Sequence, residues 1–352
     1  MTRDISTLPA PLEGPAVWYG PEVASSAAWR FSFSDAELEE LQQAAQVCLD
    51  TLPDISAMRQ AHFVLPTLAP RLQEIHRFLI EGPGFALVRA LPVRDWPLEV
   101  SAAVFFGLGC HLGNPRPQNA RGHVLGHVVD LGLSADDPNV RIYQTHERQT
   151  FHTDSCDIVG LLCLQEAVDG GDSALVSANT IYNELVRQAP RLAAALMDPV
   201  ATDRRGEFAA GEKPFFEIPV FNWHEGRMSS IYQRQYIDSA QRFPEAMRLT
   251  PLHVEALDAF DLLANDPRLN FMMRLAPGDM QFVHNHTLLH DRTAFRDHAD
   301  PAQRRHLLRL WLSSPAARPL PDVFAQRFGS VVPGERGGVS VPPERWHAPL
   351  AP

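Results

Sequence analysis

The sequence predicts a mainly β protein with flanking helices, an α+β chain whose core is a double-stranded β-helix, or jelly roll. Short apolar, strand-like runs bounded by glycine and polar residues gather in the middle and the last third of its 352 residues. Helical patterns interrupt these runs without the regular strand–helix alternation of a doubly wound sheet, and no repeat period is visible. The distribution therefore favours a jelly roll.

Helical signals come first along the chain. Residues 34–37, Ser-Asp-Ala-Glu, form a capping box ahead of apolar residues at helical spacing that continue to residue 52. A second amphipathic pattern covers residues 72–80 and ends at a Gly-Pro-Gly turn. A third helix is expected over residues 98–112.

Strand-like runs and two helical insertions fill the middle of the chain. The predicted strands cover residues 85–88, 140–143, 158–164, 174–176, 230–237, 280–283 and 307–312, and the predicted helical insertions cover residues 180–196 and 253–263. Residues 1–22 and 314–352 are rich in proline and glycine, so we expect irregular surface arms on a single catalytic domain spanning 1–352. The last arm could instead cover an active-site mouth or a dimer partner.

Composition excludes several classes of protein. The formal net charge of -11 and the lack of a concentrated basic face argue against a nucleic-acid partner. Neither a secretory signal nor an apolar stretch of about 20 residues is present, so no membrane association is expected. The four cysteines lack Cys-x-x-Cys spacing, which fits free thiols in the cytoplasm. The sequence leaves a homo-oligomer open.

A histidine and an aspartate two residues apart are the most informative feature. On a strand, residues i and i+2 point to the same face, so His152 and Asp154 can both face one ion. A third ligand can come from the strand-like stretch near residue 284, where His284, His286 and His290 are candidates. Two imidazoles and one carboxylate with open positions are typical of non-haem Fe(II) sites that use dioxygen.

Five motifs in a fixed order resemble those of a known family. They are Phe-His-Thr-Asp at 151–154, Gly-Gly-Asp-Ser at 170–173, Pro-Gly-Asp at 277–279, Leu-His-Asp-Arg-Thr at 289–293 and Arg-Arg-His-Leu-Leu-Arg at 304–309. From about residue 84 to residue 312 the chain resembles TauD/TfdA-type Fe(II)/2-oxoglutarate-dependent dioxygenases. The resemblance implies a distorted jelly roll, ferrous iron, and oxidation of an unactivated C–H bond coupled to conversion of 2-oxoglutarate to succinate and carbon dioxide.

The resemblance also assigns roles to individual residues. It implies that His152, Asp154 and His290 bind the metal and that Arg305 binds the distal carboxylate of 2-oxoglutarate, with Ser173 supplying a hydroxyl to the same group. A guanidinium is a planar fork that a carboxylate can accept bidentately, which fits that role of the arginine.

Three neighbouring features refine this interpretation. Arg309 falls on the same strand face as Arg305, so it is expected to help bind the cosubstrate or an anionic group of the substrate. Relatives commonly carry glycine where this chain has Asp291, whose carboxylate is expected to face water. The carboxylate of Asp154 argues against halogenation, which needs its place for chloride. Hydroxylation is therefore the expected reaction, with desaturation and epoxidation open.

The substrate is expected to be a small molecule, and its binding residues are the least defined. Gln118 belongs to a loop ahead of the metal motif, and Tyr232, Arg234 and Tyr236 alternate on one predicted strand face. Arg292 follows the distal motif. Each of them could line a pocket, or the tyrosine and arginine stripe could be a strand face half covered by a helix.

Two other classes of protein share these ligands. One is a cupin-like metal-binding protein without turnover, but such a scaffold has no need for Arg305 and Ser173. The other is a zinc hydrolase with metal-bound water as nucleophile. It would need a general base, and Glu147 is the nearby carboxylate with a claim to that role.

Overall fold

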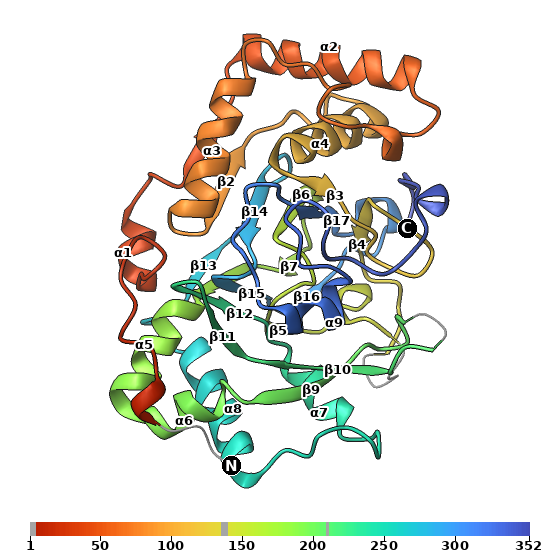
Figure 1. Cartoon of the computed structure of the whole chain (residues 1–352). Coiled ribbons are helices and arrows are strands. Elements are labelled where there is room, and N and C mark those ends of the chain that lie inside the picture. Colours follow the sequence, from red (N-terminus) through yellow and green to blue (C-terminus); the bar gives the residue numbers. More distant parts are fainter. Residues whose placement is uncertain (1–4, 135–139, 209–210) are drawn as a thin grey trace.

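Two packed β-sheets form the centre of the protein (Figure 1), whose computed structural model describes residues 5–134, 140–208 and 211–352. The larger sheet contains, in spatial order, β1 (Arg30–Ser32), β2 (Phe85–Arg89), β14 (Met280–His284), β6 (Ile158–Gln165), β17 (His306–Ser313) and β3 (Asn114–Pro115), with β4 (Gly126–Val128) beside β17. The smaller sheet contains β13 (Phe271–Met273), β8 (Ser173–Ser177), β15 (Leu288–Arg292) and β5 (Gln149–His152). This pair of sheets is the jelly-roll core that the sequence predicts.

A hydrophobic core fills the space between the two sheets. Trp311 of β17 and Val159 of β6 belong to one buried cluster with Leu175 of β8 and Leu288 of β15. Alternation along each strand sends these side chains inward and leaves the opposite face for other contacts. Each such apolar side chain stabilises the fold by roughly 1.5–3 kcal/mol relative to exposure. The core therefore holds the two sheets, and the strands that carry the site, in fixed register.

Three helices cover the outer face of the larger sheet, at the top of Figure 1. They are α2 (Asp35–Thr51), α3 (Ala69–Glu81) and α4 (Leu98–Leu112). The capping box predicted at the start of α2 is present, with Ser34 Oγ accepting from the Glu37 amide at 3.3 Å. Helix α4 is apolar on nearly all sides because it packs between the other two helices and β17. A Cβ on Gly109 would lie 2.6 Å from Leu310 Cδ1, so glycine permits this close approach.

A second group of helices packs at the other end of the molecule. It contains α5 (Ala178–Gln188), α6 (Pro190–Ala195), α7 (Arg234–Ala240) and α8 (Pro251–Ala264), beside the hairpin of β9 (Pro199–Asp203) and β10 (Phe215–Pro219). A smaller hairpin pairs β11 (Phe221–His224) with β12 (Arg227–Ser230), and β7 (Asp169–Gly170) pairs with the distant β16 (Phe295–Arg296). The helix predicted over 180–196 is two helices, because Pro190 starts α6 and Ala189 before it is not helical.

Two of the predicted strands are wrong. The run at 140–143 leads into a 3₁₀ turn, Ile142–Gln144, where the Gln144 amide donates to Arg141 O and no strand partner is needed. The run at 230–237 is the last residue of β12 followed by helix α7. An ion pair of 3.0 Å between Arg234 and Asp238, one helical turn apart, supports the helix.

Both terminal segments pack against the body of the protein. In the first, helix α1 (Gly20–Ser25) follows an irregular stretch in which the Leu12 amide donates to Asn183 Oδ1 at 2.7 Å. In the second, helix α9 (Ala325–Phe328) and short 3₁₀ turns surround Arg336, whose side chain is fully buried. We call residues 314–352 the C-terminal arm. It is more than a surface covering, because a charged side chain at its centre lies inside the protein.

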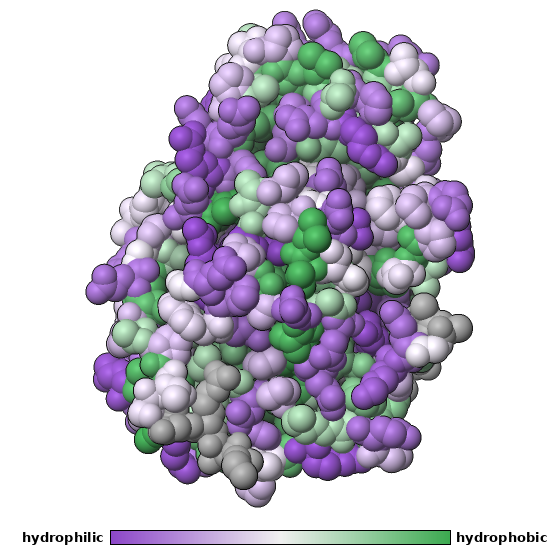
Figure 2. Space-filling view, viewed as in Figure 1, coloured by the Kyte–Doolittle hydropathy of each residue, from purple (hydrophilic) through white to green (hydrophobic). Residues whose placement is uncertain are grey.

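The surface in Figure 2 is mixed in character, with hydrophilic residues predominating and hydrophobic ones in small, separate groups. Among the described residues, no helix is both long and apolar enough to cross a membrane.

Candidate metal and cosubstrate site

The pairing of β5 with β15 brings two histidines together. His152 ends β5, and its register partner on β15 is His290. Their ring centroids lie 4.1 Å apart. Asp154 follows two residues after His152, beyond the end of the strand and not on it as the sequence predicts. The extended backbone there nevertheless turns its carboxylate toward both imidazoles.

The three side chains form a compact group of ligand atoms. Asp154 Oδ1 lies 3.9 Å from His152 Nε2, and Asp154 Oδ2 lies 3.8 Å from His290 Nε2. All three ligand atoms lie within 4.8 Å of one another, and no other group of three metal-binding side chains occurs in the part of the chain that the structure describes. Two imidazoles and one carboxylate on one side of a common point fit a mononuclear metal with open positions.

Electrostatics keep these groups in the protonation states that a metal requires. Burial alone would raise the pKa of Asp154, but Arg309 and the two imidazoles outweigh it and lower the pKa to about 2. Burial lowers the pKa of His152, and burial together with His152 lowers the pKa of His290 to about 3. The carboxylate is therefore ionised and both imidazoles are neutral at physiological pH.

Hydrogen bonds orient two of the three groups. Backbone Thr150 O accepts from His152 Nδ1 at 2.8 Å, which leaves Nε2 as the acceptor nitrogen, and Nε2 lies 2.8 Å from Gln149 Nε2. Trp311 Nε1 donates to Asp154 Oδ2 at 2.8 Å, and the Asp154 amide donates to Asn285 Oδ1 at 3.2 Å. Trp311 belongs to β17 and Asn285 directly follows β14, so the larger sheet fixes the position of the carboxylate.

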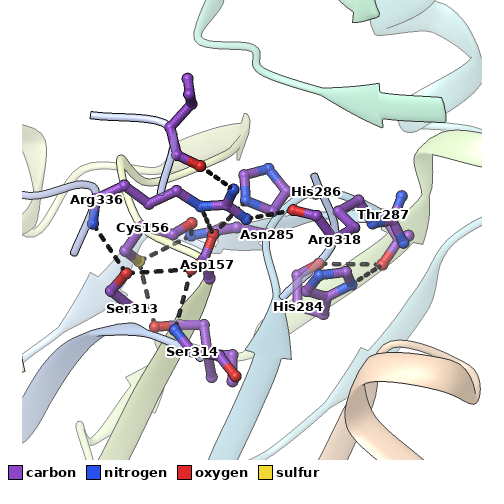
Figure 3. Close-up of polar contacts among 12 residues, drawn as sticks. Cys156, Asp157, His284, Asn285, His286, Thr287, Ser313, Ser314, Arg318 and Arg336 are labelled. Atoms are coloured by element: carbon purple, nitrogen blue, oxygen red, sulfur yellow. Dashed lines mark hydrogen bonds and ion pairs between the residues drawn. The ribbon is translucent and has the colours of Figure 1, made fainter. Parts of the chain in front are cut away.

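The rival histidines lie in a different buried cluster, shown in Figure 3. His286 Nε2 is 2.8 Å from Asp157 Oδ1, and that carboxylate also accepts from Arg336 Nε at 2.8 Å. His284 ends β14, and its Nδ1 lies 3.0 Å from Thr287 Oγ1. Asp157 is already in contact with His286 and Arg336, and this cluster provides no group of three metal-binding side chains among the described residues.

A separate cavity holds the predicted cosubstrate residues. Ser173, Arg292, Arg305 and Arg309 line it together with His290, so it adjoins the group of ligand atoms. The guanidinium of Arg305 makes one hydrogen bond, from Nη2 to Gly171 O at 3.2 Å, and its buried Nη1 has no partner among the described residues. Burial lowers the pKa of Arg305 to about 10. An unpaired buried guanidinium is a site for an anion.

Arg309 lies between that cavity and the metal group. Its Nη1 is 3.6 Å from Asp154 Oδ2, and its guanidinium carbon lies 4.5 Å from the ring centroid of Tyr143. Arg309 Nε donates to Gln118 Oε1 at 2.7 Å. Gln118 is 2% exposed and lines neither this cavity nor a second cavity that contains His152 and Asp154. The residue expected to contact substrate instead supports Arg309.

The predicted tyrosine and arginine stripe is not one face. The Tyr232 ring packs on Phe260 with centroids 4.3 Å apart, and its hydroxyl donates to Asp261. Arg234 pairs with carboxylates of α7 and α8 and lines no cavity beside the metal group. Tyr232 and Tyr236 both line the second cavity, the one that contains His152 and Asp154. The structure therefore brings the two tyrosines of the predicted stripe to one cavity, while Arg234 shares Asp261 with Tyr232 and does not line that cavity.

Three other predicted residues have clear places. Arg292 lines the same cavity as Arg305 and donates through Nη2 to Glu147 O. The side chain of Glu147 is exposed and lines neither cavity, so it does not lie where the general base of a zinc hydrolase would be needed. Asp291 does not face water, because it is 3% exposed and pairs with Arg148 at 2.7 Å.

Sequence reasoning missed three arginines of the second cavity. Arg141, Arg204 and Arg327 line it together with His152 and Asp154. They come from the stretch before a 3₁₀ turn, from the residue after β9 and from α9 in the C-terminal arm. No motif links them, and only their shared charge could have drawn attention to them.

The fold and this site define an Fe(II)- and 2-oxoglutarate-dependent oxygenase, and comparison with known proteins gives the family. Residues 50–311 match the model of the taurine catabolism dioxygenase TauD, TfdA family, and the chain belongs to that family. It is 31% identical to FR-33289 synthase of Streptomyces rubellomurinus over 335 residues, covering 92% of this chain and 97% of the relative. It is 30% identical to taurine hydroxylase-like protein SAT17 of Stachybotrys chartarum, covering 83% and 77%.

Solved structures show the same fold. An asparagine oxygenase in complex with Fe(II), 2S,3S-3-hydroxyasparagine and succinate superposes with a TM-score of 0.62 at 20% identity, covering 82% of this chain and 97% of that chain. The non-haem iron oxygenase OrfP, in complex with iron and alpha-ketoglutaric acid, superposes with a TM-score of 0.61 at 13% identity, covering 80% and 93%.

Proposed function

We propose that this dioxygenase binds Fe(II) through His152, Asp154 and His290, binds 2-oxoglutarate in the cavity of Arg305 and Ser173, and hydroxylates an unactivated C–H bond of a small molecule. The observation that carries the proposal is the meeting of three ligand atoms within 4.8 Å beside a cavity with an unpaired buried guanidinium. Bound iron would supply the activation of dioxygen that couples decarboxylation of 2-oxoglutarate to oxidation of the substrate.

The chain's own residues prepare the site for these ligands. The ionised carboxylate of Asp154 and two neutral imidazoles offer a metal three donors without the loss of a proton. Trp311 and Arg309 hold that carboxylate from one side and leave its other side to the metal. Arg305 offers one unpaired donor to the distal carboxylate of the cosubstrate, and Ser173 lines the same cavity.

The second cavity is the proposed place of the substrate. It contains His152 and Asp154 but neither Arg305 nor Ser173, so substrate and cosubstrate would approach the metal from different cavities. The solved neighbours support a small polar substrate, because one is named an asparagine oxygenase and another is in complex with a hydroxylated arginine. The four buried free cysteines and the negative net charge support a cytoplasmic enzyme without a nucleic-acid partner.

Replacement of the metal ligands tests the proposal. His152→Ala and Asp154→Ala each remove one of three donors, so we expect loss of stoichiometric Fe(II) binding and of succinate formation from 2-oxoglutarate. The matched control is His62→Ala, because that histidine is exposed and far from the site in the fold. Unchanged iron content and turnover in either ligand variant would refute the assignment. Stoichiometric zinc with no succinate in the wild-type protein would favour a hydrolase instead.

A further inference from the structure

The C-terminal arm is anchored inside the protein, beyond the last residue of the family match. Figure 3 shows Arg336 directed at Asp157, with a distance of 2.8 Å from Nε to Oδ1. Arg336 also donates to Arg318 O at 2.8 Å, and the Ser314 amide donates to Asp157 Oδ2 at 3.0 Å. Both charged groups are fully buried, so the arm has one fixed place relative to the short segment between Asp154 and β6.

This anchor positions helix α9 at the second cavity. The Gly337 amide, next to the anchor, donates to Phe328 O at 2.8 Å, and the Phe328 ring lies 5.8 Å from that of His286. Arg327 precedes Phe328 and turns the other way, into the cavity that contains His152 and Asp154. Arg327 is only 8% exposed. The arm therefore delivers a buried guanidinium to the proposed substrate cavity.

Positive charge exceeds negative charge around Arg327. Arg141 Nη2 lies 3.4 Å from Glu207 Oε1, and Arg204 has Glu212 as an opposing charge. Arg327 has no ion pair of its own among the described residues, and its hydrogen bond to Gly338 O is long, at 3.4 Å.

The other carboxylate of this region is engaged elsewhere, because Asp203 pairs with Arg242 at 3.0 Å and accepts from Ser239 at 2.6 Å. Burial and the positive charges of Arg141 and Arg204 lower the pKa of Arg327 to about 10. A buried cation that faces other cations is costly unless an anion joins them.

Arg141 adds a further donor to the same cavity. Its Nε makes no hydrogen bond among the described residues and its Nη2 has only the 3.4 Å ion pair with Glu207, although the side chain is only 13% exposed. Guanidinium groups bind oxyanions through parallel N–H donors, and a phosphoryl group accepts through three oxygens and carries up to two charges. A carboxylate carries one charge and two oxygens, so it would satisfy these groups less completely.

We propose that Arg327 of the C-terminal arm and Arg141 form a subsite for a doubly charged oxyanion of the substrate, as in a phosphate ester or a phosphonate. The inference rests on the proposed function, because it takes the second cavity to be the substrate cavity. It assigns substrate recognition in part to a segment outside the residues of the family match.

Binding of small oxyanions to the Fe(II)/2-oxoglutarate complex tests this subsite. Under anaerobic conditions, methyl phosphate and methylphosphonate are titrated by calorimetry, with acetate and methylammonium as probes of other charge. We expect saturable binding of at least one doubly charged probe, and affinity at least about tenfold lower in Arg327→Gln, equal to 1.4 kcal/mol. Arg327→Lys keeps the charge but loses the planar guanidinium, so its affinity for the probe should lie between those of the wild type and Arg327→Gln. Arg345→Gln, an exposed arginine of the same arm, is the matched control.

The outcomes separate this inference from the proposed function. Equal affinity in Arg327→Gln and the wild type, no binding of either phosphorus probe, or equal binding of methylammonium would overturn the subsite. Succinate formation in the absence of substrate, measured for the wild type and for Arg345→Gln, reports on the metal and cosubstrate and should be equal in these two proteins. Retained succinate formation without oxyanion binding would refute the subsite alone, and loss of both in the wild type would refute the function. Arg141→Gln gives a second route if Arg327→Gln does not fold.

Discussion

At the scale of single residues, Asp154 shows how neighbours control a buried carboxylate. It receives hydrogen-bond and charge contacts from Trp311 and Arg309 on one side and faces two imidazoles on the other. Because burial alone would favour protonation, the low pKa of this group depends on those neighbours. Residues that never touch the metal therefore decide whether a carboxylate is ready for it.

The indole of Trp311 offers a direct test of that support. Trp311→Phe keeps a large apolar side chain in the core but removes the donor to Asp154 Oδ2, and loss of such supporting hydrogen bonds typically lowers metal affinity about 10–100-fold. Fe(II) titration of the two proteins measures the change. Trp223→Phe, at a half-exposed tryptophan of β11, is the control and should bind iron as the wild type does. An Fe(II) affinity of Trp311→Phe equal to that of the wild type would contradict the proposed role of the Trp311 hydrogen bond.

Arg305 is expected to govern the affinity for the cosubstrate. Arg305→Gln removes the charge that faces the distal carboxylate, and truncation of one partner of a desolvated charge pair typically costs about 2–5 kcal/mol. The apparent KM for 2-oxoglutarate should therefore rise steeply in assays of succinate formation. The neighbouring Arg304 is exposed, so Arg304→Gln should leave KM unchanged. Wild-type saturation in Arg305→Gln would place the cosubstrate elsewhere.

Single residues were predictable from the sequence where a motif fixed their spacing. His152 and Asp154 lie together because they are two residues apart, although the second is not on a strand. Gln118 was expected at the substrate, yet it supports Arg309 from 191 positions away in the sequence. Arg327 was missed because its place depends on how a proline-rich segment folds back, which no local pattern encodes.

At the scale of elements, the local patterns that succeeded were those with several agreeing signals. Residues 98–112 form a helix with the predicted bounds, and the strand runs at 158–164 and 307–312 are the paired centre of the larger sheet. The run at 230–237 failed because its alternation of polar and apolar residues is short. The i,i+4 pair of Arg234 and Asp238 within it is a helical signal that could have corrected the prediction.

The anchor of the C-terminal arm should contribute strongly to stability. Arg336→Met removes the cation and leaves Asp157 buried beside His286, and breaking a buried ion pair in this way typically costs about 3–5 kcal/mol. Urea unfolding of the apo protein measures the loss. Arg345→Met, an exposed arginine, should change the free energy of unfolding by less than about 0.5 kcal/mol. An equally small effect of Arg336→Met would mean that the arm is held by its apolar contacts alone.

At the scale of the whole molecule, the fold is set by contacts between distant segments. The sequence predicted the jelly roll from the distribution of strands, but not which strands pair. Strand β14 lies between β2 and β6, and β15 lies between β8 and β5, so each sheet joins segments from both halves of the chain. Register of this kind depends on tertiary packing, which short-range periodicity does not describe.

Buried neutral histidines throughout the molecule predict how its stability depends on pH. Burial lowers the pKa of His123 and of His306 to about 4, and it lowers the pKa of His284 well below its usual value. Unfolded histidines titrate near about 6.5, so between that pH and about 4 the unfolded chain binds more protons than the native one. The free energy of unfolding should therefore fall as the pH is lowered through this window.

Carboxylates act in the same direction at lower pH. The pKa of Asp157 is lowered, because its contacts with His286 and Arg336 outweigh burial, so its contribution is present above about 4 and is lost as the pH falls through its native value. Urea unfolding of the apo protein at pH 7.5, 6.0 and 5.0 checks the histidine window. His306→Gln should reduce the change in the free energy of unfolding per pH unit in this window. A free energy of unfolding that does not change with pH in the wild type would show that the buried imidazoles do not control the pH dependence.

The position of Arg336 so late in the chain bears on how the enzyme matures. Until that arginine arrives, the buried carboxylate of Asp157 lacks its cation, and the cavity beside the metal ligands lacks one wall. A nascent polypeptide whose residues 314–352 are still inside the ribosome therefore lacks the wall that carries Arg327. We expect the proposed substrate cavity to be completed only after these residues have emerged.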